Sequence, residues 1–313
     1  MSALGDIVER ARRGATDRWT AGPLDAATAA RFAAASGDHV ALAELARPHP
    51  LAPLLLLPSV LDWGIGSDQA VMRPDGMSPR EAPYVDGADV RLVHGGMAIR
   101  WYRHPRIGDD GIAAGRSARA ATLRTGRRGE VARIDLRTRY VDRGGPVASV
   151  DESLFCLSDN GPDDGAVRPA PEFAADAPAD VIDRFDAVRL SRFSAACWNS
   201  HRIHLDADFA RHEGFSGPVV QSTLHGVMVQ RAAAAASGRR DLPIELSWRN
   251  LAVVVAGQTV RSAAWPENAT PAADGVRFAA VEWDDRGVVT ARGIVRYSPD
   301  GPLIGPSGYS VRG

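Results

Sequence analysis

The chain has 313 residues, of which 45% are hydrophobic and 24% are charged, and its net charge is −1. This composition is ordinary for a globular protein, and the length fits one large domain or two of moderate size. All 37 positive charges are arginines. The balanced charge argues against a surface for nucleic acid or for an anionic membrane.

The two cysteines, Cys156 and Cys197, are too few for a disulfide scaffold, and their spacing matches no metal-binding motif. The N-terminal residues show no basic region followed by an apolar run, so we expect no signal peptide. Apolar runs such as 251–256 are too short to cross a bilayer. We therefore expect a cytoplasmic protein.

Apolar periodicity in the first half predicts helices followed by strands. An amphipathic helix is expected over residues 4–19, a short helix over 25–35 and a buried helix between Leu51 and Trp63, followed by a surface loop over 64–88. Residues 90–103 read as strands interrupted by glycines. Further strands are expected over 117–125, 131–142 and 146–157, with a hairpin turn at Asp142-Arg-Gly-Gly-Pro.

Residues 158–180 are rich in Gly, Pro, Asp and Ala, which is typical of a linker. Beyond it the pattern begins again. Phe193 stands six residues before Asn199, as Phe32 stands six before Asp38. In each half there follow an apolar helix candidate (51–63 and 222–236), a strand leading to Gly-Asp or Gly-Gln (108–109 and 257–258) and a hairpin (near 142–145 and 284–287).

Four features thus recur in the same order, which predicts a duplicated unit of one helix and an antiparallel sheet. The expected division is a first half at 1–157, a linker at 158–180 and a second half at 181–313.

The most informative stretch runs from Phe193 to Asp206 and reads Phe-Ser-Ala-Ala-Cys-Trp-Asn-Ser-His-Arg-Ile-His-Leu-Asp. It is followed by Gly-Pro-Val-Val-Gln-Ser at 217–222 and then by a helix-like run. A helix start presents unpaired backbone N–H groups that can stabilise an oxyanion, and histidines can transfer protons.

These residues resemble the hydratase motif of the MaoC-like double hot-dog enzymes, most closely the hydroxyacyl-thioester dehydratase type 2 branch, which includes mesaconyl-C4-CoA (3-methylfumaryl-CoA) hydratase. The resemblance covers most of residues 25–300, including Pro105 to Asp109, which is one residue shorter than the family's Pro-to-Gly-Asp piece. It implies an α+β fold of two tandem hot-dog units and a hydro-lyase that hydrates an enoyl thioester or dehydrates a 3-hydroxyacyl thioester.

The resemblance implies a general acid or base role for His204, which falls on the motif histidine. Asn199 occupies the position of the motif aspartate, and an amide can hold water but cannot exchange a proton at neutral pH. Asn199 and His201 are assigned to the catalytic group with the division of acid and base roles left open, and Asp206 could also take part. The alternative for His201 is a loop or helix-edge residue packed near the site. The matching position of the first half is Ala43, so the first half is expected to shape the acyl site without catalysing.

Ser222 matches the family's oxyanion-donating glycine, and a serine is also a good helix cap. Gln221 is placed with it in the oxyanion and substrate-binding group. Arg202 could bind a substrate carboxylate or phosphate, or form a salt bridge that fixes the loop. His225 faces either the pocket or the core. His94 could line the pocket from the first half, although packing within a strand is the simpler interpretation.

No metal is expected, because the cluster of His201, His204 and Asp206 lacks a distant fourth ligand at recognisable spacing, and no cofactor is expected. The expected partner is an acyl-CoA or acyl-carrier thioester, with mesaconyl-C4-CoA as the specific candidate, and a homodimer of the double unit is compatible with the fold. Two alternatives remain open: a hot-dog thioesterase, which the absence of Asp and Glu from 223–236 disfavours, and a non-catalytic acyl-thioester-binding subunit.

Overall fold

The computed structural model describes residues 2–14, 16–20, 24–60, 72–85, 90–126, 129–158, 171–239, 241–267 and 275–299. Its helices are α1 (Ala3–Arg13), α2 (Ala26–Ser36), α3 (His39–Glu44), α4 (Leu56–Ser59), α5 (Ala187–Cys197), α6 (Ala207–His212) and α7 (Ser222–Ser237), with a 3₁₀ turn η2 (Arg202–His204). The strands are β1 (Asp17–Thr20), β2 (Arg91–Trp101), β3 (Ala113–Gly126), β4 (Gly129–Asp142), β5 (Gly145–Leu157), β6 (Val181–Arg184), β7 (Glu245–Asn250), β8 (Thr259–Pro266), β9 (Val276–Asp284) and β10 (Val289–Tyr297).

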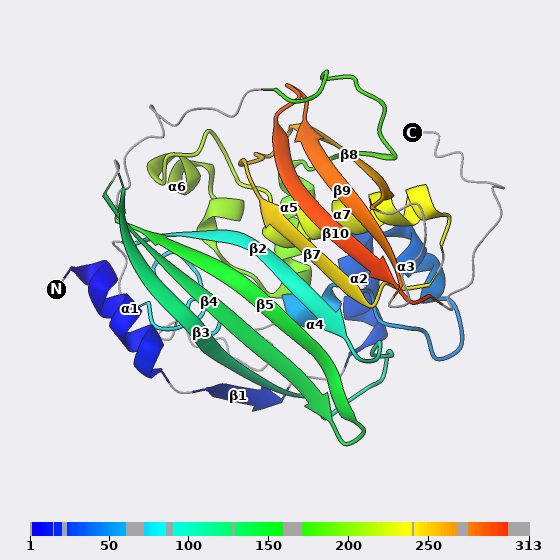
Figure 1. Cartoon of the computed structure of the whole chain (residues 1–313), viewed down its shortest axis with the longest axis horizontal. Coiled ribbons are helices and arrows are strands. Elements are labelled where there is room, and N and C mark those ends of the chain that lie inside the picture. Colours follow the sequence, from blue (N-terminus) through cyan, green and yellow to red (C-terminus); the bar gives the residue numbers. More distant parts are fainter. Residues whose placement is uncertain are drawn as a thin grey trace.

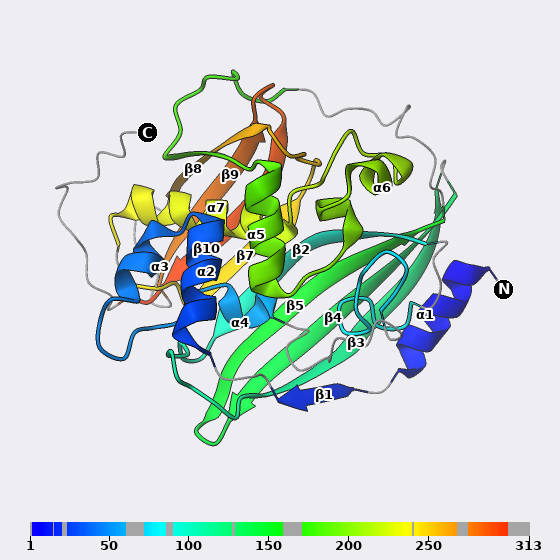
Figure 2. The same ribbon diagram turned by 180° about the vertical axis from the view of Figure 1, so that it is seen from behind.

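All the strands join one antiparallel sheet in the order β1-β3-β4-β5-β2-β7-β10-β9-β8-β6. The order is symmetric about the β2–β7 contact, where Met97 pairs with Trp248 and Ile99 with Leu246. Each half therefore contributes five strands. Corresponding strands of the two halves occupy equivalent positions in the order on either side of this seam. Figures 1 and 2 show that α2, α4, α5 and α7 cover the same face of the sheet.

The internal repeat is visible in the helices α2 and α5. Each begins after an aspartate cap, Asp25 or Asp186, and each ends at a residue in the left-handed region, Gly37 or Trp198. The two repeat phenylalanines meet between these helices, with the ring centroids of Phe32 and Phe193 5.3 Å apart. The positions paired in the sequence are therefore paired in space.

The repeat also extends to single backbone hydrogen bonds. Gly108 and Gly257 both have φ 94°. The N–H of Gly108 donates to the carbonyl of Leu24, and the N–H of Gly257 donates to the carbonyl of Phe185, each over 2.8 Å. The two Gly-polar turns thus close the two halves in the same way, as expected for a double hot-dog fold.

The central helix of the second half is α7, which lies against β7 to β10 and buries most of its length. Gly226 sits on Trp248 so closely that an added Cβ would lie 2.8 Å from the indole ring. In the first half the corresponding segment contains α4 at Leu56–Ser59, and residues 61–63 of the expected helix lie outside the described part of the chain.

The first helix is shorter than the sequence predicted. It ends at Arg13, because its buried positions Leu4, Ile7, Val8 and Ala11 stop there and Gly14 is extended. Residues 17–20 instead form β1, which pairs with β3.

The region 90–103 was predicted as separate strands, but it contains one continuous strand, β2. The register against β5 shifts between His94 and Met97, so the glycines make a bulge and do not end the strand. Gly96 has φ 129°, and a Cβ on it would lie 2.2 Å from the carbonyl oxygen of Trp248. The close approach of β7 therefore requires glycine at this position.

Part of the expected linker, residues 159–170, lies outside the described residues, as do 64–71 and 86–88 of the expected loop. The end of the linker is irregular but packed: Phe173 stacks on Trp283 with ring centroids 4.6 Å apart. The division at 1–157 and 181–313 remains a prediction. No helix in the described ranges is long and apolar enough to cross a membrane.

Candidate active site

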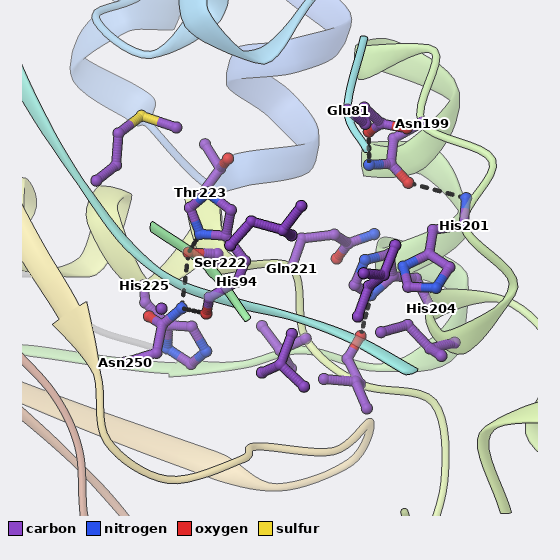
Figure 3. A pocket seen from close by; sticks show the side chains of 18 of the residues that line it. Glu81, His94, Asn199, His201, His204, Gln221, Ser222, Thr223, His225 and Asn250 are labelled. Carbon is purple, nitrogen blue, oxygen red and sulfur yellow. Dashed lines mark hydrogen bonds between the residues drawn. The ribbon is translucent and has the colours of Figure 1, made fainter. Parts of the chain in front are cut away.

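A cavity of about 310 Å³ lies where the two halves meet. The first half lines it with α4, β2, β3, β5 and the segment 77–81, and the second half with α5, η2, the segment 215–221, the start of α7 and residues 250–254. Figure 3 shows one polar group around Glu81, Asn199, His201 and His204 and a second around Ser222 and its partners, with Gln221 between them.

His204 is held by the chain that leads into α7. Its Nδ1 lies 2.8 Å from the carbonyl oxygen of Val219, which can only accept, so Nδ1 carries the proton and Nε2 has a lone pair. Burial lowers the pKa of His204 to about 4, and the bond to Val219 opposes this only in part. The imidazole is therefore neutral near pH 7, with an accepting nitrogen on a residue that lines the cavity.

His201 lies next to His204, and the two rings meet edge to face with centroids 5.5 Å apart. Burial lowers the pKa of His201 well below its usual value, and His204 and Arg73 lower it further. Both histidines are consequently neutral near pH 7. A buried pair of this kind can accept and donate hydrogen bonds without carrying charge.

The loop before η2 is fixed by the first half of the chain. The N–H of Arg202 donates to the carbonyl of Asp75 over 2.8 Å, and the hydroxyl of Ser200 donates to the carbonyl of Gly76 over 2.7 Å. Gly76 has φ 86°, and a Cβ on it would lie 2.1 Å from the carbonyl oxygen of Ser200. Glycine is needed for this contact.

Asn199 is positioned directly after α5 by the left-handed backbone of Trp198. Its Oδ1 accepts the N–H of His201 over 3.1 Å, and its Nδ2 donates to Oε1 of Glu81 over 2.5 Å. Because a backbone N–H can only donate, the amide has one possible orientation. The residue at the motif aspartate position thus presents a donor to a carboxylate from the first half.

Ser222 is the first residue of α7, and three side chains contact its hydroxyl. Its Oγ accepts from Nε1 of Trp248 over 3.1 Å and from Nδ2 of Asn250 over 2.8 Å. It lies 3.0 Å from Nδ1 of His94, which the N–H of Gly96 also approaches. Since that N–H needs an acceptor, Nδ1 is unprotonated and Ser222 donates to it. The one donor and the two acceptor positions of the hydroxyl are thereby all occupied, and the hydroxyl fixes the start of α7 to β2 and β7.

The network continues from His94 into the first half. Its Nε2 donates to Glu152 over 3.2 Å, and Arg116 pairs with the other oxygen of the same carboxylate. Burial alone would raise the pKa of Glu152, but Arg116 and then His94 lower it to about 2. Glu152 is therefore ionised, and Arg116, the one arginine among the described lining residues, is neutralised by it.

Gln221 and the backbone at the start of α7 have separate tasks. Nε2 of Gln221 donates to the hydroxyl of Ser194 over 2.8 Å and to the carbonyl of Leu190 over 3.2 Å, which ties α7 to α5. Among the described residues no side chain caps α7, and both Ser222 and Thr223 line the cavity. Their N–H groups lie where a helix terminus carries a partial positive charge, which suits a developing oxyanion.

Arg202 does not line the cavity in the described residues. Its guanidinium pairs with Asp206 over 2.7 Å and lies 4.4 Å from the centroid of the Phe209 ring. These contacts correspond to the salt bridge that the sequence left open as the alternative to substrate binding.

His225 belongs to a buried cluster on the sheet side of α7. Its Nδ1 lies 2.6 Å from Oε1 of Glu282, which also accepts from Thr290 over 2.5 Å. Sequence reasoning left His225 undecided and found no carboxylate within α7. The structure supplies Glu282 from β9, and His225 also lines the cavity.

Sequence reasoning also missed Glu81, Glu152 and Asn250 as lining residues. Glu81 and Asn199 are 118 positions apart, and His94 and Ser222 are 128 apart, so no local spacing indicates these contacts. In the sequence, the residues His94-Gly95-Gly96 were the one feature that indicated a lining residue from the first half. In the described residues no three His, Cys, Asp or Glu side chains could hold a metal ion, and the buried Cys156 and Cys197 are free thiols.

Comparison with known proteins is consistent with this geometry. Over 197 residues the chain is 29% identical to a mesaconyl-C4-CoA hydratase of Chloroflexus aurantiacus, a match that covers 59% of this chain and 64% of the relative. A MaoC-like dehydratase from Phytophthora capsici aligns with a TM-score of 0.64 at 19% identity, covering 94% of this chain and 98% of that one. A Mycobacterium tuberculosis protein described as having a double hot-dog fold aligns with a TM-score of 0.58 at 16% identity, covering 90% and 96%.

The fold is thus a double hot-dog with its candidate site at the junction of the two units. Residues 67–256 match the profile of the hydroxyacyl-thioester dehydratase type 2 family, which is more than half of the chain. The chain belongs to this family, and the predicted resemblance is confirmed.

Proposed function

We propose that the protein is a hydro-lyase that reversibly hydrates an enoyl thioester to a 3-hydroxyacyl thioester. The observation that carries the proposal is a neutral His204, with an unprotonated Nε2, in the cavity that also contains the uncapped start of α7. Membership of the hydroxyacyl-thioester dehydratase type 2 family supports the same reaction.

Hydration needs a group that binds and polarises the water that attacks Cβ. Nε2 of His204 can accept a hydrogen bond from this water. Protonating a histidine with a pKa of about 4 from solvent at pH 7 would cost about 4 kcal/mol, since each pH unit corresponds to about 1.4 kcal/mol. We assign His204 to the water and expect a second group to share the proton transfer.

The other candidate residues support this centre. The N–H groups of Ser222 and Thr223 are proposed to bind the thioester carbonyl oxygen as negative charge develops. Asn199 and His201 are proposed to hold His204 and the water in place, and Gln221 to anchor the α7 start to α5. Arg202, at the surface beside Asp206, is proposed to stabilise the loop that carries His204.

For the substrate, we propose a CoA-linked short acyl chain, with mesaconyl-C4-CoA as the specific candidate and an acyl-carrier thioester as the alternative carrier. The choice of mesaconyl-C4-CoA rests on the Chloroflexus relative. Arg116 is already paired with Glu152, so this ion pair gives no reason to expect that Arg116 binds a substrate carboxylate. Crotonyl-CoA lacks the distal carboxylate of mesaconyl-C4-CoA, and comparing the two substrates therefore tests whether the site recognises that group. A cytoplasmic location and a homodimer of the double unit complete the proposal.

The test is a hydration assay on three thioesters: crotonyl-CoA, a long-chain enoyl-CoA and mesaconyl-C4-CoA. Loss of the conjugated C=C absorbance should be seen with at least one of them, with a 3-hydroxyacyl or hydroxydicarboxylic thioester as the product. Release of free thiol instead would identify a thioesterase. Binding of all three without turnover would identify a non-catalytic binding subunit, and either result would contradict the proposal.

A further inference from the structure

The carboxylate that contacts the motif position lies on the other half of the chain. Asn199 stands where the general motif has aspartate, and an amide cannot transfer a proton at neutral pH. Its Nδ2 donates over 2.5 Å to Glu81, from the segment before β2. Glu81, Asn199 and His204 all line the same cavity, and Figure 3 shows Glu81 above Asn199 on the side of the two histidines.

The position of the Glu81 carboxylate is well defined. Asn199 cannot turn its oxygen toward Glu81, because that oxygen accepts the N–H of His201. The second oxygen of Glu81 lies 3.3 Å from the N–H of Ser78, which donates to it. Each carboxylate oxygen therefore accepts from a donor that holds it in place.

The Glu81 carboxylate also influences a second residue that lines the cavity. Cys197, at the end of α5, also lines the cavity, and burial raises the pKa of its thiol well above the usual value. The next contribution to that increase is the negative charge of Glu81. An anion at this point would also act on a water bound near Asn199.

We propose that Glu81 is the catalytic carboxylate of this site and that Asn199 is its positioning residue, an assignment that rests on the proposed hydro-lyase function. In the general motif the carboxylate and the histidine come from the same hot-dog unit. In this chain the carboxylate comes from the first unit and the histidine from the second, so neither unit contains a complete site.

The proton balance of hydration follows from this arrangement. Glu81 takes a proton from the water as the water oxygen bonds to Cβ, while Nε2 of His204 accepts a hydrogen bond from the other water hydrogen. The C=C electrons move to Cα and the thioester oxygen, where the N–H groups of α7 stabilise the enolate. The protonated Glu81 then returns the proton to Cα, so that H and OH have been added and the carboxylate is restored.

The decisive variant is Glu81→Gln: its amide oxygen can still accept from Asn199, whereas the longer contact with the N–H of Ser78, the charge and the proton acceptor are lost. We expect kcat for hydration to fall about 100-fold or more. Binding of butyryl-CoA, which cannot be hydrated, should stay within about twofold. Glu172→Gln, which alters a half-exposed carboxylate paired with Arg292 outside the cavity, is the matched control and should keep wild-type activity.

The exchange variant Glu81→Gln with Asn199→Asp returns a carboxylate to the motif position with the hydrogen bond reversed. It should recover at least about tenfold of the activity lost in Glu81→Gln. If Glu81→Gln alone does not fold, hydration by the exchange variant above about a tenth of wild type supports the assignment, and its absence overturns it.

Glu81→Gln with kcat within about threefold of an active wild type would overturn the assignment of Glu81 and leave the hydro-lyase function intact. A loss that the exchange variant does not recover would also overturn it, because the defect would then be one of local packing. A wild type without hydration on any of the three thioesters would overturn the proposed function itself.

Discussion

Three histidines of this protein, the buried His201 and His204 and the half-buried His104, share one electrostatic property. Burial lowers the pKa of His104 and His204 to about 4 and that of His201 well below its usual value. The folded protein therefore keeps all three rings neutral at pH 6, where an unfolded chain would carry them largely protonated. Below pH 6.5 the unfolded state binds more protons than the folded state.

This difference predicts a loss of stability on acidification. A depressed histidine pKa contributes stability that is complete above pH 6.5 and is lost as the pH falls toward 4. Glu152, with a pKa of about 2, adds a second loss between about 4.5 and 2. We expect the free energy of unfolding, measured by urea titration, to fall by about 2 kcal/mol or more between pH 7.5 and pH 4.5.

The variant His204→Gln should reduce this pH dependence, because an amide does not titrate. His212→Gln, which replaces an exposed histidine, is the control and should retain the wild-type profile. A free energy of unfolding that stays constant from pH 7.5 to pH 4.5 would contradict the neutral state of the three rings.

At the scale of secondary structure, the contact between α7 and β7 combines fold and site. Trp248 is fully buried against Gly226 of α7, and its Nε1 donates to Ser222 at the beginning of the same helix. Any displacement of the indole ring would therefore also disturb the hydroxyl that fixes the α7 start. Packing and the position of the proposed oxyanion donors depend on one side chain.

Gly226→Ala tests this coupling. Alanine would favour the helix by about 1 kcal/mol, but its Cβ would lie 2.8 Å from buried ring atoms. We expect a net loss of about 1–3 kcal/mol in the free energy of unfolding, with reduced hydration activity. Gly217→Ala has no atom within 4 Å of its Cβ and should change neither quantity. Unchanged stability in Gly226→Ala would contradict the tight packing.

Most elements could be predicted because their signals are local. Alternating residues predicted β3, β4 and β5, and the apolar run 222–236 predicted α7. The predicted end of the first helix and the predicted break in the strand at 90–103 were wrong, and both errors lie at glycines, which can adopt more than one backbone conformation. Gly14 ends α1 early, while Gly95 and Gly96, read as a break between strands, form a bulge inside β2.

Of the candidate site, the sequence predicted the part that comes from the single segment 199–204. His204, His201 and Asn199 lie within six residues, so their pattern was readable from the sequence. Glu81 and His94 reach the same cavity from the first half, through contacts that depend on how the two units pair. The orientation of the Asn199 amide also required the structure, because it depends on Glu81 and the N–H of His201.

At the scale of the whole molecule, two duplicated units contribute different residues to one cavity. The two units keep the same strand order about the β2–β7 seam and the same closing turns at Gly108 and Gly257. Their chemistry has diverged: the second unit supplies His204 and the α7 start, whereas the first supplies Glu81 and the pair His94 and Glu152. The seam is where these contributions meet.

The most direct test of the account is the hydration rate of His204→Ala beside wild type, on whichever thioester wild type hydrates best. We predict an about 10²- to 10⁴-fold lower kcat, because the reacting water loses the Nε2 that accepts its hydrogen bond, with butyryl-CoA still bound. Hydration by His204→Ala at a rate close to wild type would contradict the assignment of the reacting water to His204, and with it the proposed mechanism.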